Sequence, residues 1–189
     1  MPGKAFIHSA QSQRTAGDLY ETPYSLTELL LNEITCFEPE DTILEPAKGN
    51  GAIEKVLRKR FDSVTAYDIE KDFFTETGHY DWVFTNPPYN LADRFVEKAR
   101  EVATKGVIML LRTNFLSGVQ RYRDGRFNEL NSVFIFTRMP DLRFPIREDG
   151  KFHTGGIVYA WFVWLKGYDL KPVIHWLDNQ DYVLKKADK

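Results

Sequence analysis

The segment TILEPAKGNGAIEKVL, residues 42–57, indicates the fold of the chain. Residues 42–44 favour a short strand, Gly49 and Gly51 favour a tight turn, and apolar residues from Ile53 onward recur at helical spacing. A strand, a glycine turn and a helix in this order form the first unit of a doubly wound sheet, in which the turn and the helix N-terminus face a ligand. The sequence therefore predicts an α/β protein with a ligand site beside the glycines.

This turn lacks the motifs that bind phosphate groups. A dinucleotide fingerprint has a third glycine and a P-loop continues with Gly-Lys-Ser/Thr, and neither pattern follows Gly51. The carboxyl group of Glu45, at the end of the strand, also disfavours a phosphate. It suits a ligand with a positively charged ammonium group.

The next predicted strand, residues 64–68, ends in Asp68, about 20 residues after the glycines. A nucleoside-binding sheet places here the carboxylate that accepts hydrogen bonds from the ribose hydroxyls. Glu70 is the alternative acceptor, and Asp68 capping the following turn is the competing interpretation. Only residues 71–80 separate this strand from the next, so we expect the usual helix and third strand to be shortened.

The strand predicted at residues 81–85 ends in the tetrapeptide Asn86-Pro87-Pro88-Tyr89. Two consecutive prolines end a strand and make the turn stiff. The Asn86 amide oxygen and the Pro87 carbonyl can accept both N–H bonds of an exocyclic amino group, while the Tyr89 ring stacks on the attached base. A proline turn is also an ordinary way to leave a sheet, so the interpretation as a site depends on its neighbouring motifs.

Taken in order, these motifs resemble those of class I S-adenosylmethionine-dependent amino-methyltransferases of the NPPY type, which act on adenine N6. The glycine turn resembles their adenosylmethionine loop, and Thr22-Pro23 before a helix resembles the segment that they place against the methionine end of the cofactor. The resemblance covers roughly residues 20–116. More loosely, the segment YAWFVW at 159–164 after a basic loop is similar to small methyltransferases encoded by phages and prophages.

The resemblance implies a Rossmann-like class I methyltransferase fold. We expect a mostly parallel central sheet of about six or seven strands, an antiparallel final strand, and a shortened region between the second strand and the NPPY strand. Residues 1–19 are predicted to form a loose N-terminal arm and residues 20–189 a single methyltransferase domain, with a target-contacting loop at 138–156.

The resemblance also implies the residues of the site. The predicted catalytic residues are Asn86, Pro87, Pro88 and Tyr89. The predicted cofactor-binding residues are Thr22, Pro23, Glu45, Pro46, Ala47, Gly49, Gly51 and Asp68, with Asp72 at the adenine amino group and Phe73 along the adenine ring.

Contacts to nucleic acid are predicted where basic side chains alternate with aromatic rings, because phosphates bind the former and bases stack on the latter. The predicted contacts are Arg112, Asn114, Arg138, Arg143, Phe144, Arg147, Lys151 and His153. Acidic residues dilute the charge of the loop, and a solvated hairpin loop is the alternative interpretation.

Bulk composition limits the function classes. The chain has 189 residues, the size of one domain, and a net charge of −2, so any surface for nucleic acid must be local. The single cysteine, Cys36, excludes an internal disulfide, and the four histidines have no ligand spacing, so no metal is predicted. Neither a signal-peptide pattern nor a run of membrane-spanning length is present, which predicts a cytoplasmic protein without a membrane partner.

The predicted function is S-adenosylmethionine-dependent transfer of a methyl group to an exocyclic amino nitrogen, with adenine N6 in DNA favoured. RNA adenine and a protein glutamine amide are alternatives, because release-factor glutamine methyltransferases use the same tetrapeptide. A non-catalytic protein that binds a nucleoside or a partner is an alternative of another class. Since no separate recognition domain is predicted, we expect weak sequence selectivity, a partner protein, or an unpaired substrate.

Overall fold

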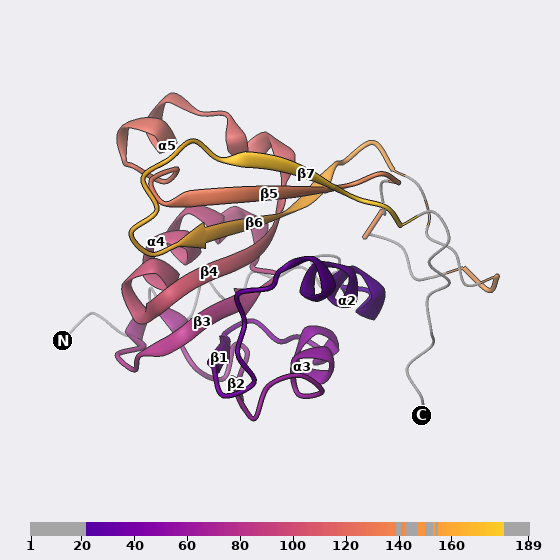
Figure 1. Cartoon of the computed structure of the whole chain (residues 1–189), viewed down its shortest axis with the longest axis horizontal. Helices are drawn as coiled ribbons and strands as arrows, with labels where there is room; N and C mark the ends of the chain where they lie inside the picture. Colours follow the sequence, from indigo (N-terminus) through magenta and orange to yellow (C-terminus); the bar gives the residue numbers. More distant parts are fainter. Residues whose placement is uncertain (1–21, 139–140, 143–146, 150–152, 154, 180–189) are drawn as a thin grey trace.

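The structure is a computed structural model that describes residues 22–138, 141–142, 147–149, 153 and 155–179. The arm predicted at residues 1–19 lies outside the described residues. The centre of the molecule is a twisted seven-stranded sheet with the order β2-β1-β3-β4-β6-β5-β7 (Figure 1). Its strands are β1 (Thr42–Glu45), β2 (Ser63–Ala66), β3 (Tyr80–Thr85), β4 (Ala103–Arg112), β5 (Leu130–Phe136), β6 (Tyr159–Leu165) and β7 (Val173–Leu177).

The sheet is mostly parallel, as predicted. β1 pairs in parallel with β2 and β3, β3 with β4, and β5 with β7, whereas β6 runs antiparallel to both β4 and β5. The expectation of an antiparallel final strand is therefore wrong: the antiparallel strand is β6, and β7, which follows it along the chain, is parallel to its neighbour β5. This order has a physical reason: β6 is apolar throughout and almost wholly buried, so it takes an interior position, while β7 is exposed except at Leu177 and forms an edge.

Helices cover both faces of the sheet (Figure 1). The helices α2 (Tyr24–Glu33) and α3 (Ala52–Leu57) pack on one face, and their core includes Leu30, Ile53 and Trp161. The helix α4 (Ala92–Val102) packs on the other face through Phe95 and Ala99, which lie four residues apart on its buried side. The short helix α5 (Val119–Arg123) and the 3₁₀ turns η1 (Phe73–Thr75), η2 (Tyr89–Leu91) and η3 (Thr113–Leu116) complete the described elements.

The start of α2 differs from the sequence pattern. Ser25 and Glu28 match a capping box, but the N-cap is Pro23, without a side-chain cap, and Ser25 lies buried in the first turn. The capping box is therefore wrong. Tertiary packing fixes this turn instead, because the Trp161 ring donates a hydrogen bond of 3.0 Å from Nε1 to the Leu26 carbonyl.

The connection between β2 and β3 is short, as predicted, and contains only η1. Buried Glu76 organises it, accepting hydrogen bonds from the Tyr67 hydroxyl at 3.0 Å, the Lys71 ammonium at 2.6 Å and the Gly78 amide at 2.9 Å. Burial raises the pKa of Glu76, but these hydrogen bonds outweigh burial and bring the pKa down to about 2. An ionised carboxylate thus replaces the missing helix as the support of this loop.

No helix in the described ranges combines the length and the apolar character that a membrane crossing needs.

Candidate active site

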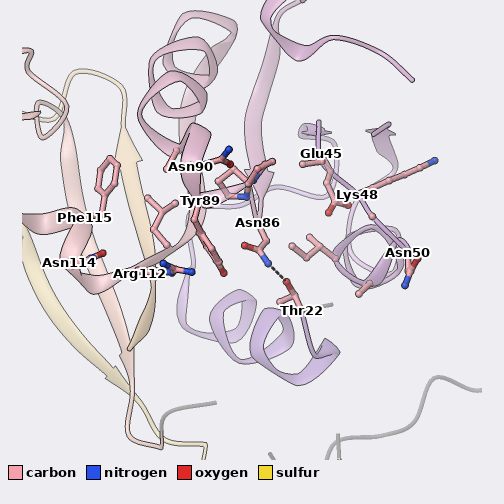
Figure 2. Close-up of a pocket in the computed structure, with 18 of the residues that line it drawn as sticks. Thr22, Glu45, Lys48, Asn50, Asn86, Tyr89, Asn90, Arg112, Asn114 and Phe115 are labelled. Atoms are coloured by element: carbon pink, nitrogen blue, oxygen red, sulfur yellow. Dashed lines mark hydrogen bonds between the residues drawn. The ribbon is translucent and has the colours of Figure 1, made fainter. Parts of the chain in front are cut away.

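The carboxyl ends of β1, β3 and β4 open onto a cavity of about 350 Å³ (Figure 2). Neighbouring parallel strands share one edge, so the turns that follow them meet there. The residues that line the cavity are Thr22, Glu45, Ala47, Lys48, Gly49, Asn50, Ala52, Ile53, Asn86, Pro87, Pro88, Tyr89, Asn90, Ala92, Leu111, Arg112, Asn114, Phe115 and Arg121.

The glycine turn between β1 and α3 forms one wall. Gly49 and Gly51 have φ angles of 52° and 78°, in the left-handed region that favours glycine, and Gly51 is the N-cap of α3. The Asp68 carboxylate accepts a hydrogen bond of 2.9 Å from the Gly49 amide, and the Lys48 amide donates to the Tyr67 carbonyl at 3.1 Å. The end of β2 therefore holds the turn in its open shape.

Glu45 contributes a buried carboxyl group to the same wall (Figure 2). The residue is 1% exposed, and its Oε2 atom has no hydrogen-bond partner among the described residues. Burial, with a smaller contribution from the charge of Glu54, raises the pKa of Glu45 to about 8. A buried carboxyl oxygen without a partner is suited to a positively charged ligand group.

The opposite wall holds Asn86, which follows β3 directly. Its Nδ2 atom donates a hydrogen bond of 3.0 Å to the hydroxyl of Thr22, and Figure 2 shows the amide oxygen turned toward Tyr89. The Tyr89 ring lies 5.5 Å from the Tyr159 ring, centroid to centroid. The Arg112 guanidinium lies 4.8 Å from the centroid of Tyr89, and Tyr89 stands between Asn86 and Arg112 in Figure 2.

The turn after β4 closes the far side of the cavity. Arg112 ends the strand, and its buried Nε atom has no hydrogen-bond partner in the described part of the chain. Arg121 of α5 reaches back over the Phe115 ring at 4.5 Å and makes two hydrogen bonds to the Asp93 carboxylate, of 2.8 and 3.0 Å. The rim therefore carries two arginines and the exposed Asn114 beside the aromatic Tyr89.

All of the predicted catalytic residues, and some of the predicted cofactor-binding and nucleic-acid-contacting residues, meet in this cavity. Those that line it are Thr22, Glu45, Ala47, Gly49, Asn86, Pro87, Pro88, Tyr89, Arg112 and Asn114. Outside the lining lie Pro23, Pro46, Gly51, Asp68, Asp72 and Phe73.

The last two of these residues have other partners. Asp72 caps η1 by accepting a hydrogen bond of 3.0 Å from the Phe74 amide. The Phe73 side chain is fully buried, and its ring centroid lies 5.0 Å from that of Phe95 in the core.

None of the described residues of the loop at 138–156 lines the cavity. The Arg138 amide donates to Asn179 Oδ1 at 2.8 Å, Arg147 pairs with Asp149 at 3.5 Å, and the His153 carbonyl accepts from the Asp141 amide at 2.7 Å. Arg143, Phe144 and Lys151 lie outside the described residues.

Several lining residues were not predicted from the sequence. Asn90 directly follows the NPPY motif, and Asn50 lies inside the glycine turn, so the position of each in its motif is the signal that could have found them. Arg121 belongs to a polar segment with no motif, and its contacts with Asp93 and Phe115 hold it at the rim.

No protein-family model matches the sequence, and no curated protein matches it. Solved structures do resemble it. One is a protein from Listeria monocytogenes described as a class I S-adenosylmethionine-dependent methyltransferase, with a TM-score of 0.60, 12% identity, and coverage of 90% of this chain and 70% of that one. Another is the methyltransferase subunit of a type I restriction-modification system from Streptococcus thermophilus, with a TM-score of 0.59, 12% identity, and coverage of 91% and 49%.

A third similar structure is the M protein of the type I restriction enzyme EcoKI, with a TM-score of 0.59, 12% identity, and coverage of 84% and 48%. The chain thus spans about half the length of the two restriction-modification proteins. At identities this low, the structural similarity establishes the fold alone. The chain has the Rossmann-like class I methyltransferase fold, with a mostly parallel seven-stranded sheet.

Proposed function

We propose that this protein is an S-adenosylmethionine-dependent methyltransferase that methylates an exocyclic amino nitrogen, adenine N6 in DNA. The observation that carries the proposal is that one cavity holds the Asn86 amide and the Tyr89 ring opposite the glycine turn and the Glu45 carboxyl group. The class I methyltransferase fold supports the reaction. Similarity to two restriction-modification proteins supports DNA as the substrate.

The residues present fit the cofactor. The Glu45 oxygen without a partner suits its ammonium group, and the glycine turn leaves backbone and open space where a nucleoside can approach. The residues proposed to hold it are Thr22, Pro23, Glu45, Pro46, Ala47, Gly49, Gly51 and Asp68. Asp72 and Phe73, which were predicted at the adenine, are not included, because Asp72 caps η1 and the Phe73 side chain is fully buried. When bound, S-adenosylmethionine supplies a methyl group attached to a positively charged sulfur.

On the substrate side, the described residues that line the cavity include neutral acceptors in Asn86 and Pro87. The Asn86 oxygen and the Pro87 carbonyl accept the two N–H bonds of the target amino group, which concentrates its lone pair on nitrogen. The Tyr89 ring stacks on the base and fixes its plane. Orientation and polarisation by these groups are sufficient for a direct transfer, so no covalent enzyme intermediate is required.

The residues at the rim of the cavity support DNA as the polymer that carries the target amino group. Arg112 and Asn114 beside Tyr89 provide a cation and an amide where the strand flanking a target base would run. A base in a duplex must be flipped out before it can enter, and a partner protein that supplies target recognition is part of the proposal. The cytoplasm is the proposed location.

The test is incubation with labelled S-adenosylmethionine and separate DNA, RNA and protein pools, followed by nucleoside and amino-acid analysis. Label recovered as N6-methyladenine in DNA is the expected result. Label found only in RNA or on glutamine would mean that the same reaction takes place on another polymer. Cofactor binding without label in any pool would instead favour a non-catalytic binding protein.

A further inference from the structure

Exposed apolar side chains gather beside the rim of the cavity. Leu116 of η3 and the α5 residues Val119 and Tyr122 are 39%, 69% and 78% exposed. Val119 and Tyr122 lie three residues apart in the helix and therefore share one face of α5. A cluster of apolar groups that folding leaves in water, next to a cavity, is typical of a contact surface.

Contacts of Arg121 hold α5 in place at this rim. The guanidinium makes two hydrogen bonds to Asp93 of α4, donates from Nη1 to the Ser117 carbonyl at 2.9 Å, and lies over the Phe115 ring. Phe115 and Arg121 both line the cavity. Tyr122 is the next residue along the chain and does not line the cavity, so its ring stands in solvent directly outside the rim.

The same segment carries a local excess of positive charge. Residues 112–126 contain four arginines and one acidic residue, Asp124, in a chain whose net charge is −2. Arg121 and Arg126 pair with carboxylates of α4, whereas exposed Arg123 makes no ion pair with a residue in the described ranges. The guanidinium of Arg123 is therefore available to an anionic ligand.

We infer that the exposed face of α5 binds an unpaired strand of DNA beside the target base, with Tyr122 stacking on one base and Arg123 contacting a phosphate. An exposed ring beside a free cation binds single-stranded nucleic acid, because bases stack on the ring and phosphates pair with the cation. Bases in a duplex are stacked on one another, so the ring reaches the face of a base only where the strand is unpaired. This inference rests on the proposed function and makes its substrate single-stranded DNA.

Binding of a fluorescent single-stranded oligonucleotide, measured by anisotropy, tests the ring without turnover. We expect Tyr122→Ala to raise the Kd by about 5-fold to 150-fold, the range for the loss of one base–aromatic stack. Tyr122→Phe keeps the ring and should stay within about threefold of the wild type. The control Trp176→Ala removes a ring of β7 that is 68% exposed and does not line the cavity, and its Kd should equal that of the wild type. A duplex of the same sequence should bind more weakly than the single strand.

The salt dependence of the same binding tests Arg123. In Arg123→Gln, the slope of log Kd against log salt concentration should fall by about 0.7, the value for one lost phosphate contact with a single strand. Tyr122→Ala removes no charge and should keep the slope of the wild type. Neither Tyr122 nor Arg123 lines the cavity, so their variants should bind S-adenosylmethionine with the Kd of the wild type, which also shows that they are folded.

The outcomes distinguish this inference from the proposed function. A wild type that binds the single strand through Tyr122 but methylates no DNA would overturn the proposed function and leave the binding surface in place. A wild type that methylates DNA, while Tyr122→Ala binds the single strand equally well, would overturn the inference alone. Equal losses in Tyr122→Ala and Trp176→Ala, or tighter binding of the duplex than of the single strand, would also overturn it.

Discussion

Glu45 carries a carboxyl group that is almost completely removed from water. Its carboxyl group is 1% exposed, lies near the charge of Glu54, and has one oxygen without a partner among the described residues. Burial is the main cause of the rise in its pKa from 4.5 to about 8. A protein that keeps such a group loses stability unless a ligand compensates, which is typical of a binding site.

The raised pKa of Glu45 predicts the direction of a pH effect. Between the unfolded pKa of 4.5 and the folded pKa of about 8, the folded chain holds a proton that the unfolded chain has lost. The stability of the ligand-free wild type relative to Glu45→Gln should therefore fall as pH rises, by up to about 1.4 kcal/mol per pH unit. Urea unfolding of both proteins between pH 5 and 8 measures this difference. A difference independent of pH would contradict the assignment.

At the residue scale, the sequence predicted which residues meet in the cavity better than it predicted their hydrogen bonds. Asn86, Tyr89 and Glu45 could be predicted because each follows a strand in a recognisable motif. The Asn86–Thr22 hydrogen bond joins residues 64 positions apart and has no local pattern. Likewise, no sequence rule places the Arg112 guanidinium on the Tyr89 ring, because the two residues follow different strands.

At the scale of elements, the position of each strand along the sequence was predictable, whereas its neighbours in the sheet were less predictable. Val173–Leu177 forms β7 directly after Pro172, and its β-branched and aromatic residues are a local signal for a strand. The place of β6 between β4 and β5 follows from burial on both faces and could not be read from periodicity alone. The capping box failed for a related reason: a tertiary hydrogen bond from β6 fixes the first turn of α2.

That contact between β6 and α2 can be tested. Trp161→Phe removes both a buried hydrogen bond to Leu26 and part of a fully buried ring, so we expect a loss of about 2–4 kcal/mol in the free energy of unfolding. The matched control is Trp176→Phe on β7, where the ring is 68% exposed, and its effect should stay within about 0.5 kcal/mol. Equal effects of the two substitutions in denaturant unfolding would contradict the packing described.

The contact between β2 and the glycine turn makes a second prediction at this scale. Asp68 accepts the Gly49 amide proton at 2.9 Å, and it is also the proposed ribose ligand. Asp68→Ala should weaken S-adenosylmethionine binding by about 1–3 kcal/mol, because hydrogen bonds to a charged group are lost. Titration calorimetry measures the Kd. The control is Asp62→Ala, because Asp62 is exposed and directly precedes the same strand. An unchanged Kd in Asp68→Ala would remove Asp68 from the site.

At the scale of the whole molecule, the topology accounts for the site. Three parallel strands end at one edge, and this convergence could be predicted from the order of the motifs alone. The residues predicted for the adenine of the proposed cofactor, Asp72 and Phe73, do not line the cavity. Hydrogen bonds to buried Glu76 hold the short connection after β2, and Phe73 of this connection is buried in the core. The length of a connection does not reveal such packing.

The most direct test of the account compares wild type with Asn86→Ala on one DNA substrate. Both proteins are first titrated with S-adenosylmethionine, for which equal Kd values within about threefold are expected, since Asn86 is assigned to the substrate. Digested DNA is then analysed for methylated nucleosides. The account predicts N6-methyladenine with the wild type and a loss of at least about 100-fold with Asn86→Ala. Equal methylation by the two proteins would contradict it.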